Sequence, residues 1–349
     1  MFSEKRFSFD NIPDLSGKVA IVTGANTGIG FVTARELVRK NAHVFIASHS
    51  KDRGEPAVEL IKKETKKDSV EFLQLELKSL NSVKRAAETF LARNLTIAYS
   101  LFTLLLLPTI KASAPSRIVN VSSKGHHRTP PTGIEFEKLN DPNAHTSFQR
   151  YAQSKLANIL FTIELNKRLS ETNVYCNSLH PGIIKTEITR GIVANWGTWL
   201  NPIISITSLF LLSPDDGALT QLYCATSPEI EEKNLCGRYF EPFGEIGEPS
   251  AQGKDEELAK KLWNFSENLI KEKLGDVIFI NHSLRPSFQT DQYFLSKYLL
   301  TVMKFGEIDK TLTCLSIKIQ IFVFYLNIQC RKKFAIILNV TNDKLKIFQ

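Results

Sequence analysis

Apolar and polar residues alternate with two different periods along the first part of the chain. Residues 18–23 are a short apolar run with the pattern of a buried strand, and residues 43–47 and 70–77 are predicted as the second and third strands. Each run is followed by a segment with the spacing of an amphipathic helix, at residues 31–39, 55–66 and 82–93. Strands that alternate with helices specify a parallel sheet with right-handed crossovers, so the sequence predicts the α/β class.

This alternation fails after residue 93. A further apolar helix is predicted for residues 99–111 and a strand for residues 117–121, but only residues 94–98 separate that helix from the preceding one. Two consecutive crossover helices without a strand between them are unusual in a doubly wound sheet. We therefore expect a sheet from which one strand is missing.

The regular order returns afterwards and continues to the end of one domain, predicted as residues 1–275. The remaining predicted helices cover 150–169, 216–225 and 255–271, and the remaining strands cover 173–179 and 237–240. Residues 276–349 differ in composition, with one glycine, one proline and one alanine among many Ile, Phe, Lys, Asn and Leu residues. Translated non-coding sequence and a divergent extension both explain this composition. We assign the extension no function, and a poorly ordered segment is one interpretation of it.

Net charge adds little to this picture. The chain carries +8, of which residues 276–349 supply +5 from 10 basic and 5 acidic residues. The main domain therefore carries only +3, without a basic stripe interleaved with aromatic residues, so no nucleic-acid partner is expected. The five cysteines show no CxxC pair, and the His126-His127 pair has no metal-site spacing, so no metal is predicted and the two histidines are interpreted as loop residues.

Two apolar segments could meet a membrane. Residues 199–212 are too few to span a bilayer, and residues 312–329 are interrupted by Lys318 and Gln320, so neither is predicted to be transmembrane. Residues 1–10 are charged and lack the apolar core of a signal peptide. A cytoplasmic location is expected, with membrane association as an added possibility.

A glycine turn follows the first predicted strand. Its spacing, Gly24-x-x-x-Gly28-x-Gly30, places backbone N–H groups and a helix N-terminus where a pyrophosphate can bind. The spacing differs from the GxGxxG form, and a plain tight turn would also explain the glycines alone. Its position between a buried strand and a helix favours dinucleotide binding.

Tyr151 and Lys155 lie four residues apart, which places both side chains on one face of a helix. An ammonium group beside a phenol favours the phenolate, so the Tyr151 pKa is expected to fall toward neutral pH. A tyrosine with such a pKa can donate and accept protons. By itself the pair would more often be two surface neighbours.

Four motifs together resemble one family. Thr23-Gly24-Ala-Asn-Thr-Gly28-Ile-Gly30, Asn120-Val-Ser-Ser123, Tyr151-x-x-x-Lys155 and His180-Pro181-Gly182 occur in the order found in short-chain dehydrogenases/reductases. Arg117-Ile-Val-Asn-Val-Ser-Ser123 and Ser154-Lys-Leu-Ala-Asn158 are similar to the retinol-dehydrogenase-like branch, and the resemblance covers about residues 15–275.

The resemblance implies a Rossmann-type doubly wound parallel sheet and transfer of a hydride between NAD(P) and an alcohol or carbonyl substrate. Tyr151 would exchange the hydroxyl proton, while Lys155 would lower its pKa and hold the nicotinamide ribose. Ser123 would hydrogen-bond the substrate oxygen, and the motif favours it over Ser122. The implied cofactor-binding residues are Gly24, Asn26, Gly28, Ile29, Gly30, His49, Glu76, Tyr151, Lys155, Pro181, Gly182, Ile183 and Thr186.

The choice of cofactor depends on the residues after the second strand. Ser48-His49-Ser50-Lys51 offers no acidic residue for the ribose of NAD, and related NADP enzymes often carry Arg where His49 stands. With Lys51 and Arg53 close by, NADP(H) is favoured and NAD stays possible. Glu76 stands where the family usually has Asp.

The chain also departs from the family. The resemblance implies a fourth strand carrying Asn-Asn-Ala-Gly and a relay asparagine in the next helix, but the segment after Leu95 looks deleted and Leu95 stands where that asparagine belongs. We therefore expect a Rossmann-type sheet that lacks its usual fourth strand. Either another segment fills the position, or the sheet closes around the gap, or the chain folds poorly.

Two functions follow from these observations. The first is an oxidoreductase for a lipophilic alcohol or carbonyl compound, because the apolar residues 188–212 stand where such enzymes carry a substrate lid. Contact of these residues with a membrane surface, or plain core packing, would explain them too. The second is a catalytically silent or misfolded product of a truncated or mis-spliced gene that at most binds a nucleotide or a partner. The family commonly forms homodimers through the helix carrying Tyr151 and its predecessor.

Overall fold

The computed structural model describes residues 6–48, 50–75, 103–104, 106–107, 110–139, 141, 143–184, 211–274 and 334–338. Two compact units divide the chain, one made of residues 1–267 with 332–349 and the other of residues 268–331. The division differs from the predicted boundary at 275/276, because residues from the end of the predicted extension belong to the first unit. All described residues except 268–274 lie in that first unit.

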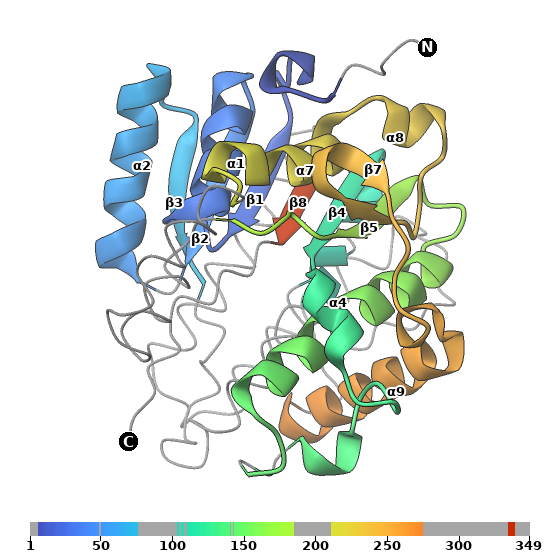
Figure 1. The fold of residues 1–349 in the computed structure, drawn as a ribbon. Coiled ribbons are helices and arrows are strands. Elements are labelled where there is room, and N and C mark those ends of the chain that lie inside the picture. Colours follow the sequence, from blue (N-terminus) through green and yellow to red (C-terminus); the bar gives the residue numbers. More distant parts are fainter. Residues whose placement is uncertain are drawn as a thin grey trace, which may run out of the picture. The chain divides into compact units, whose positions relative to one another are not determined.

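An eight-stranded sheet forms the centre of the first unit, in the order β3-β2-β1-β8-β4-β5-β6-β7 (Figure 1). Every neighbouring pair is parallel except β6 and β7. The strands are β1 Val19–Thr23, β2 His43–Ser48, β3 Val70–Gln74, β4 Ser116–Val121, β5 Val174–Leu179, β6 Tyr239–Glu241, β7 Glu245–Ile246 and β8 Phe334–Leu338. This order confirms the predicted Rossmann-type class, with helices between parallel strands.

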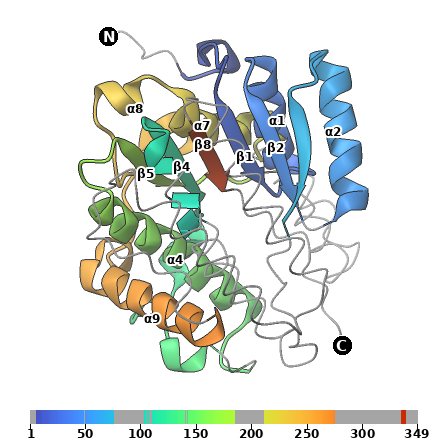
Figure 2. The same cartoon turned by 180° about the vertical axis from the view of Figure 1, so that it is seen from behind.

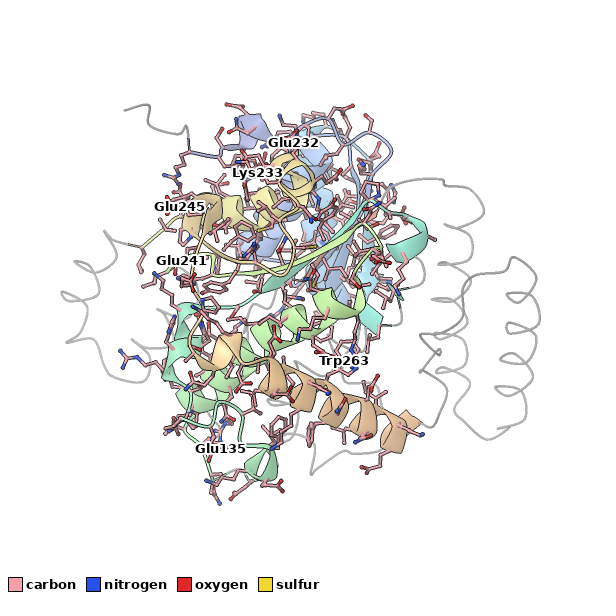
Figure 3. The ribbon with its side chains drawn as sticks, turned by 90° about the vertical axis from the view of Figure 1, so that its right-hand side faces the viewer. Glu135, Glu232, Lys233, Glu241, Glu245 and Trp263 are labelled. Atoms are coloured by element: carbon pink, nitrogen blue, oxygen red, sulfur yellow. The ribbon has the colours of Figure 1, made fainter. Side chains whose placement is uncertain are left out.

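Helices cover both faces of the sheet (Figures 1 and 2). On one face α1 packs against α2 and α7, and on the other α4 packs on β4 and β5. The helices are α1 Gly28–Arg39, α2 Lys51–Thr65, α4 Ser147–Arg168, α7 Pro214–Thr226, α8 Glu229–Glu232 and α9 Glu256–Leu274. Trp263 of α9 stacks on Phe161 of α4, with ring centroids 5.7 Å apart (Figure 3). Aromatic stacking and burial of this kind fix α9 against α4.

Local sequence explains most of these elements. All five residues of β1 are buried, as their β-branched and apolar character requires for a central strand. Thr146 and Gln149 form a capping box at the start of α4, which satisfies two backbone N–H groups of the first turn. α2 begins at Lys51, four residues before its predicted start, because Ser50 takes the N-cap position with extended backbone.

Some predictions fall outside the described residues or were incomplete. The predicted helix 82–93 is not described, and within the predicted helix 99–111 the described residues 103–104, 106–107 and 110–111 are helical. α8 and β7 were not predicted, since four and two residues are too few to show a period.

The position between β1 and β4 is filled by β8, from the end of the chain. In this strand Ala335 pairs with Ala20 on one side and with Arg117 on the other. The sequence predicted a sheet lacking the strand that normally follows in this position, and the structure shows that a segment distant in sequence takes it. A function was not assigned to residues 276–349, and five of them now contribute backbone pairing on two sides.

Paired cysteines can test the register of β8. Oxidation of the Ala20→Cys/Ala335→Cys double variant should form a disulfide, because facing Cα atoms on neighbouring strands are about 5 Å apart, within disulfide reach. The bond is identified by mass spectrometry of the peptides that contain both positions.

The control is Ala20→Cys/Ile336→Cys. A shift of one residue turns the second side chain to the opposite face of the sheet, so this pair should stay reduced. Equal disulfide formation in both variants, or none in either, would contradict the register of β8.

Candidate active site

The sequence-predicted site residues gather where β1, β4 and β5 end. Because these strands are parallel, their carboxyl ends lie at one edge of the sheet, where the order of strands reverses on either side of β1. Ligands of open α/β sheets bind in the crevice at such a switch point. The described cofactor and catalytic residues all come from segments at this edge.

The glycine turn connects β1 to α1. Gly24 and Gly28 have φ angles of +64° and +61°, a region that residues with a Cβ atom rarely adopt. No atom lies within 4 Å of a Cβ built on Gly28, so the backbone is open to an approaching ligand. Ile29 and Gly30 are buried in the first turn of α1, while Asn26 is half-buried. The turn fits a bound pyrophosphate.

The two serines after β4 differ in their surroundings. Ser122 is buried and its hydroxyl donates to the backbone carbonyl of Lys155 at 2.7 Å, which holds β4 to α4. Ser123 is half-buried, caps the following 3-10 helix η2 (Lys124–Arg128), and accepts from the backbone N–H of Gly125. The structure thus brings Ser123, and not Ser122, to the tyrosine described next.

α4 carries Tyr151 and Lys155 one turn apart. Ser123 lies close enough to the Tyr151 phenol to influence its pKa, and a Cβ atom built on Gly125 would lie within 3.5 Å of both side chains. The Lys155 ammonium lies 5.5 Å from the centre of the Tyr151 ring. A Cβ atom on Gly125 would lie only 3.0 Å from that ring, so the turn after Ser123 packs directly on Tyr151.

The predicted direction of the Tyr151 pKa is wrong for this structure. Burial raises the pKa of the phenol, and the nearby Ser123 hydroxyl lowers that pKa by less. The Lys155 ammonium is not directed at the phenol oxygen but donates to the carbonyl of Val121 at 3.3 Å. Burial in turn lowers the pKa of Lys155 to about 8, because a charged amine is costly away from water.

Asn158 shares the anchor of Lys155. Its side-chain amide donates to the same Val121 carbonyl at 3.0 Å, from the next turn of α4. The two donors fix where Lys155 stands relative to the end of β4. The family's relay asparagine was predicted to be lost at Leu95, which lies outside the described residues.

The segment after β5 forms another side of the site. Pro181 is buried, Gly182 has a φ of +95°, and Ile183 is 69% exposed. Ile184 forms a parallel bridge with Leu212, the last residue of the predicted lid segment 188–212. Thr186 and residues 188–210 lie outside the described residues.

A charged pair and a neutral histidine border this segment. Lys124 and Glu241 form an ion pair at 2.8 Å, and Glu241 is marked in Figure 3. Burial lowers the pKa of His180 to about 4, assisted by the charge of Lys124. The imidazole of His180 is therefore uncharged at neutral pH.

Basic residues begin α2, next to the end of β2. Lys51 and Arg53 are both exposed in its first turn, and Lys51 lies 3.5 Å from Glu55. No acidic side chain stands between Ser48 and Lys51 in the sequence. His49 and Glu76, the two other predicted cofactor residues here, lie outside the described residues.

Sequence reasoning missed His126 and Asn158. His126 was interpreted as a loop residue, but it lies in η2 and is fully buried. Its place three residues after Ser123 was the available signal, which is weak because a single histidine has many structural uses. Asn158 was noted only as part of the Ser154–Asn158 motif and was given no role.

Comparison with known proteins identifies the family. A family model described as short chain dehydrogenase matches residues 18–99. An uncharacterized oxidoreductase of Schizosaccharomyces pombe is 36% identical over 304 residues, covering 76% of this chain and 89% of the relative. The chain belongs to the short-chain dehydrogenase/reductase family. Retinol dehydrogenase 11 of Mus musculus is 37% identical over 286 residues, covering 73% of the chain and 87% of that protein, which confirms the retinol-dehydrogenase-like branch.

These alignments bear on the predicted deletion. The alignment with the relative from Schizosaccharomyces pombe has 304 positions. It covers only 76% of the 349 residues of this chain, which is fewer than 304 residues. The relative therefore contains residues without a counterpart here. The match to the family model also ends at residue 99, just beyond Leu95. Both findings agree with a segment lost after Leu95.

Solved structures support the fold. A crystal structure from Mycobacterium paratuberculosis has a TM-score of 0.57 and 26% identity, covering 76% of this chain and 98% of that one. L-sorbose reductase of Gluconobacter frateurii, solved with NADPH and L-sorbose, has a TM-score of 0.51 and 18% identity, covering 68% and 100%. Among the described residues, no side-chain cluster suits a metal ion and no helix is both long and apolar enough to cross a membrane.

Lys155→Met should remove a pH dependence of folding stability. The unfolded chain keeps the lysine proton up to a pKa near 10.5, but the folded chain releases it near 8. Between these values the unfolded state binds more protons, so stability rises with pH. Urea unfolding at about pH 7 and about pH 9.5 should show wild type gaining about 2 kcal/mol relative to the variant.

Lys63→Met serves as control, because Lys63 is exposed on α2. Its stability difference from wild type should stay constant over the same range. A constant difference for Lys155→Met as well would show that Lys155 is not titrating from a buried position.

Proposed function

We propose that this short-chain dehydrogenase/reductase uses NADP(H) to interconvert a lipophilic alcohol and its carbonyl compound. The observation that carries the proposal is the closeness of the Ser123 hydroxyl to Tyr151, at the sheet edge that also holds the glycine turn. Family membership supports the reaction class and a nicotinamide cofactor. The finer assignments rest on the residues below.

Two side chains would act on the substrate oxygen. In the direction of reduction, a bound NADPH would supply the hydride for the carbonyl carbon. The Tyr151 hydroxyl gives its proton to the carbonyl oxygen, and Ser123 donates a hydrogen bond to the same oxygen as negative charge develops. The Lys155 ammonium lies 5.5 Å from the centre of the Tyr151 ring, on the Val121 carbonyl, and would hold the nicotinamide ribose.

Exposed apolar side chains favour a lipophilic substrate. Phe148 is 55% exposed and its ring lies 6.3 Å from that of Tyr151. Ile183 is 69% exposed in the segment after β5. Apolar groups left open beside the tyrosine would gain free energy when a hydrophobic substrate covers them. Contact with a membrane surface, a cytoplasmic location and homodimer formation stay predictions from the sequence.

Tyr151→Phe should lower kcat for NADPH-dependent carbonyl reduction by about 100-fold or more, because the proton donor is lost while the ring stays. Activity is measured as NADPH oxidation by the purified full chain with a panel of apolar aldehydes and ketones. Tyr175→Phe, the same change on β5, should leave kcat unchanged.

A wild-type chain that oxidises NADPH with none of these substrates would contradict the proposal. Retained NADPH binding would then favour the alternative of a catalytically silent relative, and loss of a cooperative unfolding transition would favour a misfolded one.

Preference for NADP(H) should depend on Arg53. Its exposed guanidinium at the start of α2 can bind the 2′-phosphate, and one charge-assisted hydrogen bond is worth about tenfold in affinity. Arg53→Ala should therefore raise the Kd for NADPH about tenfold and leave the Kd for NADH unchanged, as measured by calorimetry.

Lys66→Ala provides the matched control, because it removes an exposed charge that follows the opposite end of the same helix. Equal weakening of NADPH and NADH by Arg53→Ala would contradict a 2′-phosphate contact.

A further inference from the structure

His126 is fully buried, and both of its ring nitrogens are engaged. Nδ1 lies 2.6 Å from the backbone carbonyl oxygen of Ser123, and Nε2 lies 3.0 Å from the backbone nitrogen of Ser250. Ser250 belongs to the segment between β7 and α9. The imidazole thus links the turn after β4 to a part of the chain more than a hundred residues away.

The partners determine the tautomer of the ring. A backbone N–H can only donate, so Nε2 of His126 must accept from Ser250. Nδ1 must then carry the proton and donate it to the carbonyl of Ser123, which can only accept. The ring is neutral in this arrangement, and burial lowers the His126 pKa in agreement.

The carbonyl that His126 holds belongs to the serine of the proposed site. The same carbonyl accepts the backbone N–H of His126 at 3.0 Å, and the Ser123 hydroxyl accepts from Gly125. Both ends of Ser123 are therefore fixed within one turn. Because Gly125 packs on the Tyr151 ring, a shift of this turn would displace Ser123 and Tyr151 relative to each other.

Surrounding elements fix the ring of His126. The ring of Tyr239 of β6 meets the His126 ring edge-on, with ring centroids 5.2 Å apart. The ring of His127 also contacts it, with centroids 4.1 Å apart. Ser250 is itself held, because its hydroxyl accepts from Gly253 and its carbonyl from Lys254. The imidazole is thus supported at both ends by ordered backbone.

We propose that His126 is a positioning residue for catalysis, whose protonated Nδ1 clamps the Ser123 carbonyl and thereby holds the Ser123 hydroxyl against Tyr151. The catalytic consequence of this inference rests on the proposed function. The tautomer of the His126 ring is independent of that function. If His126 were purely structural, loss of its hydrogen bond with Ser250 would lower activity as much as loss of its hydrogen bond with Ser123.

Two amide substitutions separate the two links. The amide nitrogen of Asn reaches about as far as Nδ1, so His126→Asn can still donate to Ser123 but cannot reach Ser250. The longer Gln reaches about as far as Nε2, so His126→Gln can still accept from Ser250 but loses the clamp. Misplacement of a reacting group by about 1 Å can cost up to about 100-fold in rate.

The inference predicts that His126→Gln lowers kcat by about 10- to 100-fold without changing the KM for NADPH, whereas His126→Asn keeps kcat within about threefold of wild type. His43→Gln, the same change at the first residue of β2 and so at the end of the strands opposite the site, should leave kcat unchanged. An equal loss in His126→Asn and His126→Gln, or no loss in either, would overturn the positioning role.

A measurement on the wild-type chain keeps the inference testable if a variant does not fold or if the chain shows no activity. Ring-nitrogen NMR of isotope-labelled protein at neutral pH should show one of the seven histidines as the neutral Nδ1–H tautomer, assigned by its loss in a His126 variant. An Nε2–H tautomer or a cationic ring for His126 would overturn the clamp. Absence of catalysis with the Nδ1–H tautomer present would instead contradict the proposed function alone.

Discussion

The whole sheet depends on a strand between β1 and β4. Each of these strands has a partner on its outer side, and without β8 each would leave a row of backbone N–H and C=O groups unpaired inside the domain. Each such group costs about 1–3 kcal/mol, while a domain is stable by only about 5–15 kcal/mol. Pairing by Phe334–Leu338 on both sides removes that cost.

The pairing of β8 with β1 and β4 also sets the distance between the glycine turn and Ser123. The glycine turn follows β1 and Ser123 follows β4, so the width of β8 separates the turn proposed to bind phosphate from the serine proposed to act in catalysis. With neighbouring strands about 4.8 Å apart, a sheet closed directly from β1 to β4 would bring these two groups together by that amount. Hydride transfer needs the reacting atoms about 3–3.5 Å apart, so a shift of this size would abolish it.

Sequence patterns predicted the parts of the fold that are encoded locally. The buried runs of β1 and β4, the turn at Gly24 and the helix of Tyr151 each carry their signal within a few residues. β8 could not be predicted, because Phe334–Leu338 is an ordinary apolar run and its partners lie hundreds of residues away. The Tyr151 pKa was missed for a related reason: sequence spacing shows that a lysine is near, but not which atom its ammonium faces or how deeply the phenol is buried.

The Val121 carbonyl, to which Lys155 donates, links the pairing of β4 to the proposed active site. The N–H of Ser122 bonds to Leu179 of β5, and successive residues of a strand point to alternate sides, so the carbonyl of Val121 points toward β8. The described pairing with β8 ends one residue earlier, at Asn120 and Leu338. The Val121 carbonyl accepts from Lys155 and Asn158. The edge of β4 that pairs with β8 therefore also carries the oxygen on which the lysine ammonium rests.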